Sequence, residues 1–228
     1  MREIFHGQLE QLGAELAVMC GLVAEAMTRA TEGLLTADLH LAEQVITDDR
    51  HINLLAEKCD EDACSLLALQ SPVARDLRTV VTAIKAAAKI ERMGDLAKHV
   101  ATTARLRYPT PTVPPALVDQ FVEMARCGVA ACEHLERAIA APTGDDFPAL
   151  VRVDDRVDAL HREVLDAVSL ADPPYPIQVA VDIALLARYY ERFADQAVSV
   201  AKRLDYVVAG TMPDDPPTGM IGPRHEAE

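Results

Sequence analysis

The apolar positions of this chain recur at intervals of three and four residues through six long stretches, which are separated by residues that break helices. Such spacing places the apolar side chains along one face of an α-helix. The pattern therefore predicts an all-α fold without a sheet. The expected helices cover residues 2–35, 38–69, 72–107, 115–141, 145–170 and 176–209.

Short polar residues at the expected boundaries agree with this division. Asp38 is placed to cap the second helix, and Ser71 followed by Pro72 is typical of the N-cap and first turn of the third. The segment from Thr143 to Asp146 resembles a capping box ahead of the fifth helix. Residues 210–228 are rich in proline and poor in apolar side chains, so we expect a disordered tail there.

The sequence contains an internal duplication. Residues 91–100, ERMGDLAKHV, return at an offset of 100 as ERFADQAVSV, with five identical positions. A second match relates residues 45–53 to residues 150–158, and a proline-rich linker at 108–115 separates the two copies. The repeat predicts two tandem three-helix bundles, one in residues 1–107 and one in residues 115–209.

One acidic residue interrupts the apolar seam of the second helix. Of the seam positions, seven are apolar or Cys, and the exception is Asp49. Asp154 interrupts the seam of the fifth helix at the equivalent place. A lone acid in a core stripe is costly to bury unless it is paired or bound to a metal. The seam of the second helix consists of positions 42, 45, 49, 52, 56, 59, 63 and 66.

The third and sixth helices each carry a Glu and an Asp four residues apart, where like charges share a face and repel. An apolar stripe leads to each pair, made of Leu77, Val81, Ile84 and Ala88 in the third helix and of Ile177, Val181 and Ala184 in the sixth. If neighbouring helices are antiparallel, Asp49 and Glu91 both lie about 30 Å from the turn at residues 70–71, so they should meet. The predicted clusters are Asp49, Asn53, Glu91 and Asp95 in the first half, and Asp154, Asp158, Glu191 and Asp195 in the second.

Clusters of oxygen-bearing side chains suit hard cations such as Mg²⁺, Mn²⁺ or iron, and carboxylates can bridge several ions. The alternative is a solvated helix face on which Arg92 or Arg192 forms a salt bridge with the acids. The repetition of the acids at matching heights favours the metal site.

Composition narrows the class of protein. A net charge of −14 and a pI near 4.9 argue against nucleic-acid binding, which relies on clustered Lys and Arg. No apolar run reaches the length of a membrane span, and the N-terminus does not resemble a signal peptide. The five cysteines, odd in number and without zinc spacing, are expected to be buried free thiols of a cytoplasmic protein.

The paired Glu-Arg-x-x-Asp helices resemble the signature of the PhoU family of phosphate-uptake regulators. Residues 70–78, QSPVARDLR, are similar to the family's entry to the third helix, and the likeness covers nearly all of residues 1–209. The resemblance implies tandem three-helix bundles, each with a multinuclear cluster of iron, zinc, magnesium or manganese. It also implies a negative regulator of phosphate uptake at the cytoplasmic face, between the ATPase subunit of the phosphate ABC transporter and a sensor histidine kinase, with membrane association only through these partners.

Three functions remain open from the sequence. The first is a non-enzymatic adaptor, expected to be a homodimer because dimers are the commonest oligomers. The second is a metal-dependent hydrolase that uses the carboxylate clusters to activate water. The third treats the carboxylates as solubility features only. The second cluster, with Asp158 where the first has Asn53, is expected to bind metal more tightly.

Overall fold

The computed structural model describes residues 2–169 and 175–214, and it contains helices but no β-strand in these ranges. The all-helical prediction is confirmed, and the helix ends lie within a few residues of the expected ones. The expected disorder of the tail mostly concerns residues 215–228, which lie outside the described residues. The elements are α1 (Arg2–Thr36), α2 (Leu39–Gln70), α3 (Ala74–Arg107), the short 3-10 helix η1 (Pro115–Leu117), α4 (Val118–Ala140), α5 (Asp146–Val168) and α6 (Ile177–Ala209).

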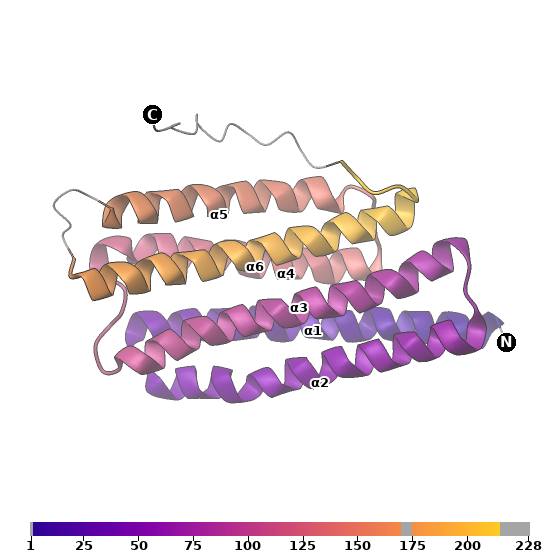
Figure 1. Cartoon of the computed structure of the whole chain (residues 1–228), viewed down its shortest axis with the longest axis horizontal. Helices are drawn as coiled ribbons and strands as arrows, with labels where there is room; N and C mark the ends of the chain where they lie inside the picture. Colours follow the sequence, from indigo (N-terminus) through magenta and orange to yellow (C-terminus); the bar gives the residue numbers. More distant parts are fainter. Residues whose placement is uncertain (1, 170–174, 215–228) are drawn as a thin grey trace, which may run out of the picture.

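Four of the helices form the centre of the molecule. α1 packs against α3 and α4, and α6 packs against α3 and α4, whereas α2 and α5 lie on opposite outer sides. In Figure 1, α2, α3, α6 and α5 follow one another across the near face, with α1 and α4 behind them. Each three-helix unit thus contributes two helices to a shared four-helix core.

One hydrophobic core runs through both units. The fully buried Tyr190 of α6 illustrates the junction, since its hydroxyl lies 2.8 Å from Thr31 Oγ1 of α1 and its ring packs edge-on against Phe121 of α4. The Thr31 hydroxyl donates to the Met27 carbonyl, so the tyrosine hydroxyl is the donor in the bond between the two side chains. The two copies of the repeat therefore form one packed body.

The two motif helices, α3 and α6, run antiparallel. Arg107 near the end of α3 forms a 2.6 Å ion pair with Asp182 near the start of α6, and Arg78 near the start of α3 donates to the Val207 carbonyl near the end of α6. The repeated motifs begin near the middle of these helices, so this pairing places parts of the two copies beside each other.

The helix boundaries confirm one of the three capping predictions in full and one in part. The Asp38 carboxylate accepts hydrogen bonds from the first backbone N–H groups of α2. The Asp146 carboxylate accepts from the backbone N–H of Thr143, as in a capping box, but the N-cap of α5 is Asp145, which forms no side-chain capping bond. The prediction for Ser71 is wrong, because Ser71 ends α2 in a left-handed conformation (φ 46°) and α3 begins only after Val73. The turn between two long helices uses this residue as a C-cap, and the Pro that follows disfavours helix at the preceding position.

All five cysteines are free thiols. The prediction that they are buried holds for Cys20, Cys59 and Cys132, but it is wrong for Cys64, which is exposed, and for Cys127, which is half-buried. None of the helices in the described part of the chain is long and apolar enough to cross a membrane.

Candidate functional site

The acid that interrupts the α2 seam is buried where the sequence predicts it. Asp49 is 4% exposed, one helical turn from the buried Val45 and close to the buried Ile52. Its Oδ2 atom accepts a hydrogen bond from Lys98 Nζ at 2.7 Å and from Asn53 Nδ2 at 3.4 Å. Its Oδ1 atom is buried and has no hydrogen-bond partner. Half of this carboxylate is therefore paired and half is not.

Close packing of α2 on α3 brings the repeated motif to Asp49. A Cβ atom at Gly94 would lie 3.0 Å from Ile52 Cδ1 and 3.7 Å from Asp49 Oδ1, so the lack of a side chain there lets the helices approach. Burial, followed by the nearby carboxylates of Asp95 and Asp49, raises the pKa of Glu91. The predicted equality of height between the acids of α2 and α3 is confirmed.

The second cluster concentrates more negative charge. Burial first, and then the carboxylates of Asp158, Asp195 and Glu191, raise the pKa of Asp154 to about 7. Burial and the nearby Asp195 likewise raise the pKa of Glu191 to about 7. Glu191 is 9% exposed, and one of its carboxylate oxygens pairs with Arg188. At neutral pH these two acids are thus close to half-protonated when no external cation is present.

Not all eight predicted ligands point toward the other members of their cluster. Asp95 turns to an ion pair with Arg92 at 3.1 Å, and Asp195 is exposed, although its pKa is raised by burial and by Asp158. As the side chains lie, no three His, Cys, Asp or Glu residues of the described chain converge closely enough to hold a metal ion. The metal site stays a prediction.

Unpaired oxygen atoms provide a test of whether a cation fits. In a folded protein nearly all buried polar atoms have partners, so each exception requires an explanation. Four predicted ligands have a buried side-chain oxygen without a hydrogen-bond partner, and all four atoms are of the kind that hard cations bind. The type of these atoms therefore suits a hard cation, although the side chains as they lie do not converge on one. The atoms are Asp49 Oδ1, Asn53 Oδ1, Asp154 Oδ1 and Glu191 Oε2.

The apolar stripe that leads to each acidic pair lies at the margin of the core. Leu77 is 41% exposed at the start of the α3 stripe, which also includes Val81, Ile84 and the exposed Ala88; Ile177 is 82% exposed at the start of the α6 stripe. The buried face of α3 lies beside this stripe, and six of its 13 buried residues are alanines. Helices at the centre of a bundle pack closely through small residues, so larger side chains at the margin stay near the surface.

Sequence reasoning missed two cations, Lys98 and Arg188, which meet the clusters. Lys98 lies seven residues after Glu91 and three after Asp95, so it shares their helix face. That spacing shows it as a neighbour of the two acids on its own helix, but not its contact with Asp49 of α2. The alternative of salt bridges from the motif arginines is correct only for Arg92, since Arg188, three residues before Glu191, holds the other pair.

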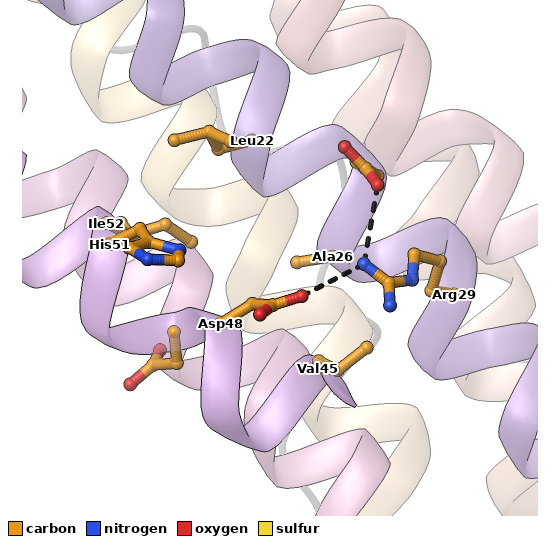
Figure 2. Close-up of a pocket in the computed structure, with 9 residues that line it drawn as sticks. Leu22, Ala26, Arg29, Val45, Asp48, His51 and Ile52 are labelled. Carbon is orange, nitrogen blue, oxygen red and sulfur yellow. Dashed lines mark hydrogen bonds and ion pairs between the residues drawn. The ribbon is translucent and has the colours of Figure 1, made fainter. Parts of the chain in front are cut away.

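Two of the hollows beside α2 are lined by predicted ligands. An open groove of about 340 Å³ between α2 and α3 is lined in part by Asn53 and Glu91, the predicted ligands. Figure 2 shows the other hollow, of about 190 Å³ between α1 and α2, in which Arg29 forms ion pairs with Asp48 (3.1 Å) and Glu25 (3.4 Å). Arg29 there is already bound by acids of both helices, and Asp49 also lines this hollow, so the predicted ligands of the first cluster are divided between the two sides of α2.

These features define a class of protein: an all-helical, internally duplicated bundle with an acidic cluster between the second and third helix of each copy. Comparison with known proteins identifies the family. A family model described as the PhoU domain matches residues 16–104 and 122–204, so the chain belongs to the PhoU family. The resemblance seen in the sequence is confirmed.

Similar proteins agree along the whole length. The phosphate-specific transport system accessory protein PhoU homolog 1 of Mycobacterium leprae is 43% identical, over 94% of this chain and 97% of its own. The crystal structure of PhoU from Pseudomonas aeruginosa superimposes with a TM-score of 0.83 at 27% identity, covering 91% of this chain and all of the other. A phosphate transport system regulatory protein PhoU from Streptococcus pneumoniae, 23% identical, has the same fold (TM-score 0.84, 92% and 99% covered). The relatives found by sequence are accessory proteins of phosphate-specific transport, in agreement with the prediction of a non-enzyme.

Proposed function

We propose that this chain is a negative regulator of phosphate uptake and of the phosphate-starvation response. It acts as a cytoplasmic, metal-binding adaptor between the ATPase subunit of a phosphate ABC transporter and a sensor histidine kinase, and it reaches the membrane only through them. The observation that supports this role is the 43% identity, over nearly the full length of both chains, to an accessory protein of phosphate-specific transport. The net charge of −14 favours basic partner surfaces.

Metal ions would be held by Asp49, Asn53, Glu91 and Asp95 in the first cluster and by Asp154, Asp158, Glu191 and Asp195 in the second. A bound cation supplies positive charge that offsets repulsion among the carboxylates. The ligands come from α2 and α3 in one half and from α5 and α6 in the other, so the carboxylates fix the outer helix of each unit against the core. Such fixing keeps the adaptor's surface in one shape, and a homodimer would present that surface twice.

The role is tested by deleting the gene in its own organism and measuring the transcripts of phosphate-scavenging genes in phosphate-rich medium. We expect these genes to be expressed although phosphate is plentiful, and expression to return to the repressed level when the full-length chain is supplied in trans. Normal repression in the deletion strain, with no related copy present, contradicts the proposal.

Direct binding is tested with the purified full-length chain and the purified ATPase subunit and kinase cytoplasmic domain. We expect each partner to co-elute with the chain, and the purified chain to show no metal-dependent hydrolysis of phosphate esters. Hydrolysis that is lost on Glu91→Gln or Glu191→Gln would support the hydrolase instead.

A further inference from the structure

The two acidic clusters differ at one position of the duplicated motif. Lys98 of α3 corresponds to Val198 of α6 at the offset of 100 that relates the two copies. Lys98 reaches the seam acid Asp49, whereas Val198 is half-buried and packs against the hydrophobic core. The first cluster therefore contains a cation of the chain itself at a place where the second cluster has none.

The second cluster also has more acidic groups without a basic partner than the first. The first contains three acids, of which Asp49 pairs with Lys98 and Asp95 with Arg92, so one negative charge is left without an ion pair. The second contains four acids and one ion pair, between Arg188 and Glu191, so three carboxyl groups are left without an ion pair. More uncompensated carboxylate charge gives a stronger attraction for an added cation.

The geometry of the ion pairs differs as well. Arg188 and Glu191 are three residues apart on one helix, and the arginine side chain is about half exposed, so this pair exchanges readily with water. Lys98 instead joins α3 to α2, and the carboxylate that it meets is almost completely buried. Removal of a cation from a buried carboxylate leaves an uncompensated charge, which is strongly unfavourable.

We propose that Lys98 is a built-in counterion that replaces a metal ion at the first cluster, so that the second cluster is where this chain binds metal. This inference rests on the metal binding in the proposed function and assigns it to one of the two sites. The Lys98 ammonium and a cation compete for the same carboxylate, and the ammonium is attached to the neighbouring helix at no loss of translational entropy.

The test uses the full-length chain, freed of metal and equilibrated with MnCl₂, with bound Mn²⁺ measured after dialysis. Lys98→Val gives the first cluster the residue of the second, and Val198→Lys makes the reverse exchange. Lys85→Val, at an exposed position of the same helix, is the control for the loss of one positive charge. We expect about twofold more bound Mn²⁺ in Lys98→Val, a large loss in Val198→Lys and no change in the control, because a ligand set binds only when its carboxylates are free.

Heat unfolding provides a second measurement that does not depend on counting ions. In EDTA, Lys98→Val should unfold at a lower temperature than the wild type because Asp49 has lost its partner, and Mn²⁺ should restore much of the difference.

Single substitutions in the otherwise unchanged chain distinguish the two clusters. Glu191→Gln should abolish most Mn²⁺ binding, while Glu91→Gln should have little effect.

Equal Mn²⁺ binding by the wild type and Lys98→Val, with equal losses in Glu91→Gln and Glu191→Gln, overturns the inference but leaves the proposed metal binding intact. Absence of Mn²⁺ from every variant overturns both.

Discussion

Gly94 is the residue on which the close approach of α2 to α3 depends. An added methyl group would press on the buried Ile52, at 3.0 Å from Cδ1 and 3.3 Å from Cγ2. Overpacking of this kind costs about 1–3 kcal/mol, and the better helix propensity of Ala offsets only about 1 kcal/mol of it. We expect Gly94→Ala to lower the free energy of unfolding by about 1 kcal/mol, as measured by urea denaturation.

Gly21 gives the matched control, since it lies inside α1 and is exposed, and an added Cβ atom would meet nothing within 4 Å. Gly21→Ala should raise the free energy of unfolding by about 0.5–1 kcal/mol through helix propensity alone. A gain of stability in both variants would show that α2 and α3 can separate at little cost, contrary to the packing described above.

Asp154 and Glu191 make the stability of the metal-free protein depend on pH. Their pKa values in the folded state are about 7, above the ordinary values near 4 that apply after unfolding. Between these values the folded state binds more protons than the unfolded state, so stability contributed by the two acids falls as pH rises from about 4 to about 7. Addition of metal at the higher pH should reverse the loss.

The matched variant is Asp154→Asn with Glu191→Gln, in which neutral amides replace the acids. In EDTA its free energy of unfolding should approach that of the wild type near about pH 5 and exceed it near about pH 8. A difference that stays constant across this range would mean that the two acids titrate normally in the folded protein.

For individual residues, the sequence predicts the buried acids better than the basic side chains that pair with them. Asp49 could be predicted because a charged residue in an apolar seam breaks a strong pattern, and Asp154 repeats it. Lys98 could not be assigned with the same certainty, because a lysine on a helix flank usually lies in water. Its contact with Asp49 depends on the approach of α2 to α3, which only the structure gives.

Among the elements, the start of α5 is held by a residue of another helix. Asp205 of α6 is 2% exposed, and its two oxygens accept hydrogen bonds from the backbone N–H groups of Asp146 (3.2 Å) and Phe147 (3.0 Å). Loss of a buried acceptor leaves donors without partners, which costs about 1–3 kcal/mol. We expect Asp205→Ala to lower the free energy of unfolding by about 2 kcal/mol in urea.

Asp145, the residue just before α5, provides the control for the Asp205 substitution. It precedes α5 as its N-cap but forms no side-chain capping bond. Asp145→Ala should therefore change stability by no more than about 0.5 kcal/mol. If both substitutions have equal effects, the stabilising residue is not the buried aspartate of α6.

Helix positions were predictable because hydrophobic spacing and breakers act locally. The seam of α2 is correct at seven of the eight positions, Ala56 being only half-buried. The buried face of α3 was less predictable because this helix contacts α1, α2 and α6, so its apolar pattern is wide and the sequence does not show which edge meets water. A cap supplied from another helix, as by Asp205, is likewise invisible to a local pattern.

At the scale of the whole molecule, the two repeats share one core and should not fold separately. A chain ending at residue 107 would expose the faces of α1 and α3 that α4 and α6 cover. We expect residues 1–107 alone to lack a cooperative unfolding transition by circular dichroism, and to regain one when mixed with residues 108–228. Cooperative unfolding of the separate segment would mean that each three-helix unit is an independent domain.

The duplication predicted two related bundles, because the repeated motif and seam acid are visible at fixed offsets. It could not predict how the bundles join, because the residues between them, such as Tyr190 and Thr31, have the same apolar or mixed character as any core position. The antiparallel meeting of α3 and α6, which brings parts of the two motifs beside each other, follows from packing between the repeats.

The most direct test of the account is metal analysis of the full-length chain purified without chelators, beside a variant with Glu191→Ala and Asp195→Ala. Glu163→Ala with Asp166→Ala, at exposed positions of α5, is the control for lost charge. We expect bound metal in the wild type and the control, and both less metal and a lower unfolding temperature in the Glu191 and Asp195 variant, since an ion that binds only the folded state stabilises it. Equal metal content in all three proteins would contradict the assignment of the carboxylate clusters as metal sites.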